Sequence, residues 1–334
     1  MKAAVVEFCV KLSADPLLVQ GAGGNVSWKD GNTLWIKASG TGLADAASKQ
    51  IFLPVDLRHL QEALAGGDYS AVPRVLGDTP LRPSIETLLH GLMPHRLVVH
   101  LHAVEILAHL VCRGGDDTLA ARLPPDIRWA SIPYAKPGAA LARELVPVLA
   151  TKSGTDVVFL HNHGVVIGGA SVEDVDQKLR LLVETLATAP RTPGPTPAPD
   201  PRARAAHGYQ QVRDPGIDQL AGDPYLFGCL PDAWALYPEQ VVFLGAEPVT
   251  CGRLEDLPAP GPDFGIAGAP PVFVRGQGVF VPPGFGAARL AVLRCYYEVL
   301  ARQNDIAAIR TLTTAEVADL LDWDAEKYRA KMAH

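Results

Sequence analysis

The chain has 334 residues, enough for one large domain and a smaller one at the usual ~100 to 200 residues each. Hydrophobic residues make up 48% and charged residues 20%, which excludes a disordered chain and a coiled coil. The net charge of -6 provides no basic field for a nucleic acid or an anionic membrane. A small-molecule substrate is therefore the expected partner.

The five cysteines are scattered and never form a Cys-x-x-Cys pair, which argues against a disulfide framework or a thiolate zinc site. Glu7 and Lys11 interrupt the apolar residues near the N-terminus before the core of a signal peptide can form. No stretch reaches the ~18 apolar residues of a membrane span. We therefore expect a cytoplasmic protein in a reducing compartment.

The first part of the chain alternates predicted helices and strands. A hairpin is indicated by Asp30-Gly31-Asn32 between two β-rich runs, because glycine in a short turn tolerates positive φ. The predicted elements are a helix at 1–20, strands at 26–28 and 33–36, a helix at 84–93, a strand at 97–102, a helix at 104–112, a strand at 156–160 and a helix at 172–186. Together they predict a mixed α/β fold with helices covering an at least partly antiparallel sheet.

A proline-rich linker is predicted at 189–205, since six of the twelve residues from 190 to 201 are proline. It separates a domain at 1–188 from a small C-terminal α+β domain at 206–334. In the C-terminal domain, strands are predicted at 241–244 and 272–275 and a helix at 287–303. That helix carries an apolar stripe that needs a partner surface, at Leu290, Leu293, Tyr297 and Leu300.

His100 and His102 form a His-x-His pair at the end of the predicted strand 97–102. Because side chains alternate along a strand, both imidazoles project from the same face. Two such rings can begin a metal site, and catalytic zinc takes a third protein ligand and an open position. His161 and His163, at another strand end, are the candidates for that ligand, while chance placement of the pair is the alternative.

Glu86 lies in a predicted helix start for which Ser84 is the expected N-cap. His90 follows four residues later, and both lie beside the apolar stripe of the helix. One interpretation is a solvated carboxylate favoured by the helix dipole. The other is a general acid/base beside the metal, with a pKa set by partial burial and by its neighbours.

Two glycine-rich turns, 21–25 and 38–42, flank the hairpin. Successive backbone N–H groups in such turns can hold phosphate or carboxylate oxygens, and Asn25 and Ser39 would add side-chain donors. The alternative is that both are simply tight turns. The first turn follows a helix, so it is not a dinucleotide-binding fingerprint.

In this order the features resemble the class II aldolase/adducin family, whose members include fuculose- and rhamnulose-phosphate aldolases. The resemblance covers residues 1–188 and implies a three-layer αβα domain with a largely antiparallel central sheet. It rests on Gly23-Gly24-Asn25-Val26-Ser27, on 34–40, on Ser84-Ile85-Glu86 with His90, on His100-Leu101-His102 and on Asn162-His163-Gly164.

The resemblance also implies roles for individual residues. They are the zinc ligands His100, His102 and His163, the catalytic acid/base Glu86, the substrate or anion contacts Asn25, Ser39, Gly40 and Ser84, and the candidate proton donor Tyr134. Manganese and cobalt are alternatives to zinc. His161 is left with a supporting role or none, and a homotetramer is the implied assembly.

The implied reaction is metal-dependent aldol cleavage or formation of a carbon-carbon bond in a ketose, ketose phosphate or hydroxy-keto acid, through a zinc-stabilised enediolate. An epimerase, a dehydratase or a decarboxylase could use the same site. A non-enzymatic, adducin-like assembly scaffold is the rival from another class. Ile85 stands where phosphate-using aldolases tend to carry a second hydroxyl residue, so the resemblance implies metal binding more firmly than phosphate recognition.

The spacing from Glu86 to His100 and the segment after the linker look most like the aldolase part of bifunctional aldolase/short-chain dehydrogenase proteins. No Gly-x-Gly-x-x-Gly follows a strand in this sequence, so we expect no NAD binding. The domain at 206–334 is expected to support substrate access or subunit contacts.

Overall fold

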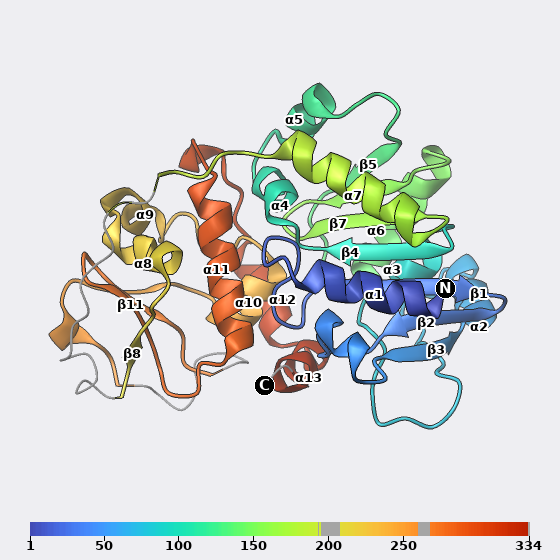
Figure 1. Ribbon diagram of the computed structural model, residues 1–334, viewed down its shortest axis with the longest axis horizontal. Coiled ribbons are helices and arrows are strands. Elements are labelled where there is room, and N and C mark those ends of the chain that lie inside the picture. The colour runs from blue at the N-terminus through green and yellow to red at the C-terminus, as the bar shows by residue number, and fades with distance from the viewer. Residues whose placement is uncertain (193, 195–207, 260–267, 333–334) are drawn as a thin grey trace. The chain divides into compact units, whose positions relative to one another are not determined.

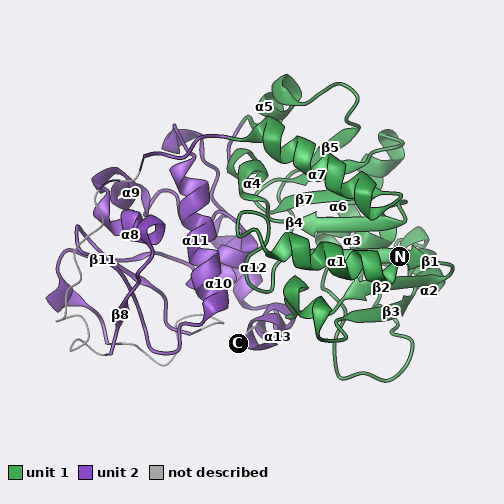
Figure 2. Cartoon of the chain, viewed as in Figure 1, with its two compact units in different colours: residues 1–110, 114–187, 333 green, residues 111–113, 188–332, 334 purple. Residues whose placement is uncertain are grey.

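The computed structural model describes residues 1–192, 194, 208–259 and 268–332, so most of the predicted linker lies outside the described residues. The chain divides into two units (Figure 2). Unit 1 comprises residues 1–110 and 114–187, and unit 2 comprises 111–113 and 188–332. Among the described residues, no helix is both long and apolar enough to cross a bilayer.

Unit 1 is built around a seven-stranded sheet in which each described pair of neighbours is antiparallel except β5 and β6. In spatial order the strands are β3 (Phe52–Asp56), β2 (Thr33–Lys37), β1 (Asn25–Asp30), β4 (Leu97–Leu101), β7 (Gly164–Gly169), β6 (Val157–Leu160) and β5 (Trp129–Ile132). The predicted hairpin joins β1 to β2, and Gly31 takes a φ of 54° in its turn. The largely antiparallel sheet is confirmed.

Helices cover both faces of this sheet, with α1 and α7 in front of it in Figure 1. One face carries α1 (Lys2–Ser13), α4 (Val104–Leu110) and α7 (Val172–Leu186). The other carries α2 (Leu57–Ala65), α3 (Thr87–Leu92) and α6 (Ala139–Thr151). The short η1 (Leu43–Ala47) and α5 (Gly115–Arg122) complete the unit. This is the expected three-layer αβα arrangement, in which each face of the sheet buries its apolar side chains under helices.

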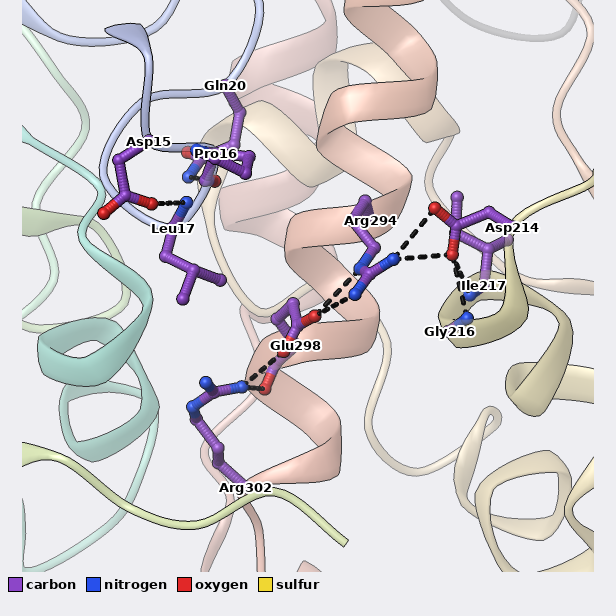
Figure 3. Close-up of polar contacts among 10 residues, drawn as sticks. All are labelled: Asp15, Pro16, Leu17, Gln20, Asp214, Gly216, Ile217, Arg294, Glu298 and Arg302. Atoms are coloured by element: carbon purple, nitrogen blue, oxygen red, sulfur yellow. Dashed lines mark hydrogen bonds and ion pairs between the residues drawn. The ribbon is translucent and has the colours of Figure 1, made fainter. Parts of the chain in front are cut away.

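The first helix ends earlier than predicted, at Ser13 rather than at residue 20. Pro16 has no N–H to continue the helix. The Asp15 carboxylate instead accepts from the Leu17 backbone N–H over 2.9 Å, and the Gln20 amide donates to the Pro16 carbonyl over 2.8 Å (Figure 3). The segment leading into the first glycine-rich turn is therefore a local turn.

Unit 2 is a smaller α+β body around a four-stranded sheet. The strands, in spatial order, are β8 (Gln210–Gln211), β11 (Gly278–Val281), β10 (Val272–Val274) and β9 (Val249–Cys251). The helices are α8 (Pro215–Gly222), α9 (Pro224–Cys229), α10 (Pro238–Leu244), α11 (Ala287–Ala301), α12 (Thr314–Leu321) and α13 (Asp324–Met332), with the short η3 (Leu254–Asp256) and η4 (Ile306–Ala308).

The strand predicted at 241–244 is wrong, because these residues belong to α10. A short apolar run suits a fully buried helix as well as a strand. Pro238 occupies the first turn of α10, and every residue of this helix is buried. The stripe on α11 packs inside unit 2, where α11 lies against α8 and α10. Leu293, Tyr297 and Leu300 are buried there, and Leu290 is half-buried.

A chain of ion pairs ties α11 to the start of α8 (Figure 3). Arg294 contacts Asp214 at 2.7 Å and Glu298 at 2.6 Å, and Arg302 contacts Glu298 at 2.5 Å. Asp214 also accepts from the backbone N–H groups of Gly216 and Ile217. The same carboxylate therefore caps α8 and anchors it on α11.

Asp218 on α8 gives unit 2 a pH-dependent stability. It is 2% exposed and accepts from the Val279 backbone N–H, and burial raises its pKa to about 6. The pKa in an unfolded chain is about 3.9, so the folded state holds the proton more tightly. The stability that this group contributes is complete below pH ~4 and is lost as the pH rises through about 6.

We therefore expect Asp218→Asn to raise the free energy of unfolding by about 1–3 kcal/mol at pH 8 and to change it little at pH 4. The asparagine oxygen can still accept from Val279. Denaturant unfolding at the two pH values measures the effect, with the exposed Asp322→Asn as control. An equal gain at both pH values would show that ionisation of Asp218 is not the cause.

Candidate metal centre

Three histidines meet where the central strands β4, β6 and β7 of the seven-stranded sheet begin or end. His100 lies on β4, His102 directly follows that strand, and His163 lies in the turn between β6 and β7. The three side chains are buried, and one ring nitrogen from each lies within 4.8 Å of the other two. The antiparallel pairing of β4 with β7 accounts for the meeting, because the end of one strand lies beside the start of the other.

Strand alternation determines the face on which the rings lie. Val99 and Leu101 enter the core under α1, α4 and α7, so His100 points to the opposite face, which α3 covers. The His100 Nδ1 atom lies 3.1 Å from the Val165 carbonyl oxygen, and its Nε2 atom lies 3.0 Å from His102 Nε2. A backbone carbonyl at one ring nitrogen is typical of metal-binding histidines, because it leaves the other nitrogen as the ligand.

The turn that presents His163 depends on its two neighbours. Asn162 is fully buried with a φ of 52°, in the left-handed region that asparagine tolerates better than most residues. A Cβ atom at position 164 would lie 2.4 Å from the Leu101 carbonyl oxygen and 2.8 Å from a ring carbon of His102. Only glycine therefore lets β7 begin this close to the histidines.

Glu86 lies against the histidine cluster. Its carboxylate oxygens are 3.3 Å from His163 Nε2 and 3.4 Å from His100 Nε2, and the residue is 4% exposed. The Asn25 amide donates to Glu86 Oε2 over 2.6 Å. The interpretation of Glu86 as a solvated carboxylate is therefore wrong, and the carboxylate is held in a set orientation beside the imidazoles of His100 and His163.

The start of α3 differs from the prediction. The helix begins at Thr87, and Glu86 rather than Ser84 takes the N-cap position. Ser84 instead forms a turn, in which its hydroxyl accepts from the Glu86 backbone N–H over 3.2 Å. This turn sets the direction in which the Glu86 side chain leaves the backbone.

His90, one helical turn after Glu86, forms a buried contact that the sequence did not reveal. Its Nδ1 atom lies 2.7 Å from the Ser27 hydroxyl on β1, and its Nε2 atom has no hydrogen-bond partner among the described residues. Burial lowers the pKa of His90 to about 3, against the attraction of Glu86, so the ring is neutral at pH 7. The contact between His90 and Ser27 holds α3 against β1. Ser27 lies two residues after Asn25 in that strand.

The second glycine-rich turn lies beside the Ser84 segment. The Ser39 backbone N–H donates to the Arg82 carbonyl, and the Ser84 N–H donates to the Lys37 carbonyl. Gly40 has a φ of 76°. The Ser39 hydroxyl is buried and has no partner among the described residues. A buried, unsatisfied hydroxyl near a candidate site is consistent with a ligand contact.

The two remaining candidates, His161 and Tyr134, are not members of the three-histidine group. His161 Nε2 lies 2.9 Å from Asp116 Oδ1, which directs the ring toward α5. Tyr134 is half-buried and follows β5, the edge strand three positions from β4. That separation is on the order of 14 Å across the sheet. A role for Tyr134 as proton donor stays a prediction.

The three imidazoles fit a divalent transition metal. Nitrogen atoms bound tetrahedrally at about 2.0–2.1 Å lie about 3.3 Å apart. The His100 and His102 nitrogens, 3.0 Å apart, are already near that separation. Three neutral nitrogen ligands with an adjacent carboxylate are typical of a catalytic rather than a structural zinc site, which would have a fourth protein ligand.

A three-layer αβα domain that gathers three histidines and a glutamate at the strand ends of a largely antiparallel sheet has the architecture of a class II aldolase. Residues 3–189 match the family Class II Aldolase and Adducin N-terminal domain, which is more than half of the chain. The chain therefore belongs to this family, and the resemblance inferred from its sequence is confirmed.

Among curated proteins, the chain is similar to the uncharacterized oxidoreductase YuxG of Bacillus subtilis, with 25% identity over 189 residues. The match covers 52% of this chain and 27% of that protein, so the chain spans little more than a quarter of its relative's length.

The solved structures that are similar to this chain include the following two. The N-terminal class II aldolase domain of a conserved protein from Thermoplasma acidophilum has a TM-score of 0.46 and 24% identity, over 55% of this chain and 90% of that one. The L-fuculose-1-phosphate aldolase of Thermus thermophilus has a TM-score of 0.38 and 18% identity, over 55% and 89%.

Proposed function

We propose that this chain is a metal-dependent lyase that cleaves or forms a carbon-carbon bond in a ketose, a ketose phosphate or a hydroxy-keto acid. Membership of the aldolase family supports this function. The observation that carries it is the buried Glu86 carboxylate, within 3.4 Å of two histidine nitrogens and held by Asn25. Burying a carboxylate has a large desolvation cost. An assembly scaffold would gain nothing from that cost.

In this proposal His100, His102 and His163 hold a divalent metal, with zinc as the first choice. When bound, the metal supplies Lewis-acid stabilisation for the oxygen charge that develops as the carbon-carbon bond breaks. Neutral imidazoles suit this role, because they leave the charge of the cation largely uncompensated.

Glu86 is the group that moves the proton. In the cleavage direction the hydroxyl on the far carbon of the bond gives its proton to water and becomes the aldehyde. The electron pair of the broken bond passes to the carbon next to the carbonyl, and Glu86 gives that carbon a proton. In the synthetic direction the Glu86 carboxylate removes the proton from the same carbon. Asn25 holds Oε2, so the geometry of the transfer is set before substrate binds.

The rest of the substrate would lie along the second glycine-rich turn. The buried Ser39 hydroxyl supports this assignment, because it lacks a partner among the described residues. The Gly40 N–H and the Ser84 turn would add donors for oxygen atoms at the far end of the substrate.

The test is a panel of ketose phosphates, free ketoses and hydroxy-keto acids, incubated with metal-loaded protein and analysed for aldehyde products by mass spectrometry. We expect metal-dependent cleavage of at least one class. Conversion without a broken carbon-carbon bond would identify an epimerase or dehydratase, and carbon dioxide release a decarboxylase. A well-folded protein that binds no metal and converts nothing would support the scaffold.

A further inference from the structure

Lys37, the last residue of β2, is a buried lysine with 1% exposure. Its ammonium group donates to the Ala22 carbonyl over 3.0 Å and to the Thr41 carbonyl over 2.5 Å. Ala22 belongs to the first glycine-rich turn and Thr41 to the second. One buried cation therefore joins the two turns, which are separated in sequence by the β1–β2 hairpin.

Asp45 and Cys9 interact electrostatically with the Lys37 side chain. A hydrogen bond from Lys49 is the main factor that lowers the pKa of Asp45, and the charge of Lys37 adds to it. Burial raises the pKa of the Cys9 thiol to about 12, and Lys37 opposes that rise. Asp45 also accepts from the Gly42 backbone N–H over 3.0 Å, so the second turn is held from both sides.

Lys37 contacts every segment that carries an expected substrate contact. Asn25, the donor to Glu86, ends the first turn, and Ser39 lies two residues after Lys37 in the second. The Lys37 carbonyl accepts from the Ser84 backbone N–H over 3.1 Å, so the third segment is fastened to the same residue. Lys37 therefore forms hydrogen bonds with the first turn, the second turn and the Ser84 segment.

We propose that Lys37 is a positioning residue, which clips the two glycine-rich turns together and places a positive charge between them. The charge favours substrates that carry a carboxylate or a phosphate group, because a buried cation is weakly screened by water. The choice of substrate class rests on the proposed function, whereas the clip is a property of the chain without ligand.

Hydrogen exchange on the full chain tests the clip. Lys37→Met keeps the apolar stem and removes the ammonium group. We expect amide exchange to accelerate about tenfold or more in both 21–25 and 38–42, the equivalent of losing one charged hydrogen bond, with β6 and β7 unchanged. Lys37→Arg, which keeps charge and donors, should restore much of the protection.

Lys29→Met is the matched control, because Lys29 is a half-buried lysine of the same hairpin that donates to the Met93 carbonyl, away from the turns. It should leave exchange in both turns unchanged. Faster exchange confined to 38–42 in Lys37→Met, or in neither turn, would overturn the clip. Should Lys37→Met not fold, Lys37→Gln repeats the measurement, since its amide can still donate to one carbonyl.

Calorimetric titration of the metal-loaded protein tests the charge. The probes are inorganic phosphate, glycolate and the neutral hydroxyacetone. We expect Lys37→Met to lower the affinity for the preferred anion about tenfold or more and to leave the affinity for hydroxyacetone unchanged. Phosphate and glycolate distinguish the two anion classes. The proposed preference for anionic substrates would be overturned by an equal loss of affinity for all three probes, by no loss of affinity, or by a wild-type protein that binds neither anion.

The outcomes separate the two proposals. If the substrate panel shows no turnover but exchange in both turns depends on Lys37, the proposed function fails and the clip stands. If turnover is found and Lys37→Met leaves both exchange and anion binding unchanged, the function stands and the role of Lys37 fails.

Discussion

The Glu86→Gln variant is expected to lose ~100- to 10,000-fold in turnover while it keeps its metal and its fold. Glutamine is nearly isosteric with glutamate, and its carbonyl oxygen can still accept from Asn25. The amide cannot take or give a proton at the reacting carbon. The loss should therefore fall on kcat, because the interaction removed is made in the transition state.

The measurement is kcat on the substrate class that the panel identifies, together with metal content and the free energy of unfolding. Glu144→Gln on α6 is the matched control, since Glu144 is an exposed glutamate of the same unit. If Glu86→Gln keeps turnover within about threefold of wild type, Glu86 is not the catalytic acid/base. Such a loss is far smaller than the usual effect of removing a general acid/base.

His100→Ala is expected to lower the affinity for the metal by more than about 100-fold. Mutation of a residue that only hydrogen-bonds to a metal ligand already lowers metal affinity by about 10- to 100-fold, and His100 is proposed as a ligand itself. His100 is central to the cluster, with its Nε2 atom 3.0 Å from His102 and 3.4 Å from Glu86. Elemental analysis of the purified variant and competition with a chelator measure the loss.

The control for this prediction is His161→Ala. His161 lies two residues before His163 in the chain, but its ring contacts Asp116. This variant should keep its metal, so a loss in both variants would point to general damage to the turn between β6 and β7. Full metal occupancy in His100→Ala would remove His100 from the ligand set.

Several parts of the site were accessible from sequence, because they follow from short-range rules. Strand alternation predicts that His100 and His102 share a face, and the structure confirms that Val99 and Leu101 enter the opposite core. The glycine after His163 was visible as a motif, although its reason became clear only from the backbone and ring atoms that a Cβ would strike.

Local rules failed where burial comes from distant segments. The apolar run at 241–244 carries no periodicity, because α10 is buried on all sides, and so it resembled a strand. Glu86 looked like an exposed helix-start residue, because nothing near it in sequence shows that β1 and β4 bring Asn25 and His100 against it.

The sequence by itself determined a mixed α/β class, the antiparallel hairpin and the shared face of His100 and His102, because alternation and turn chemistry act over a few neighbouring positions. The three-layer arrangement and the choice of His163 over His161 were implied by the resemblance to the family. Only the tertiary structure decided the environment of each group: that His90 pairs with Ser27, and that Lys37 is buried between two turns. A lysine at a strand end is ordinarily solvated. Its burial here depends on segments that the sheet, rather than the local sequence, brings together.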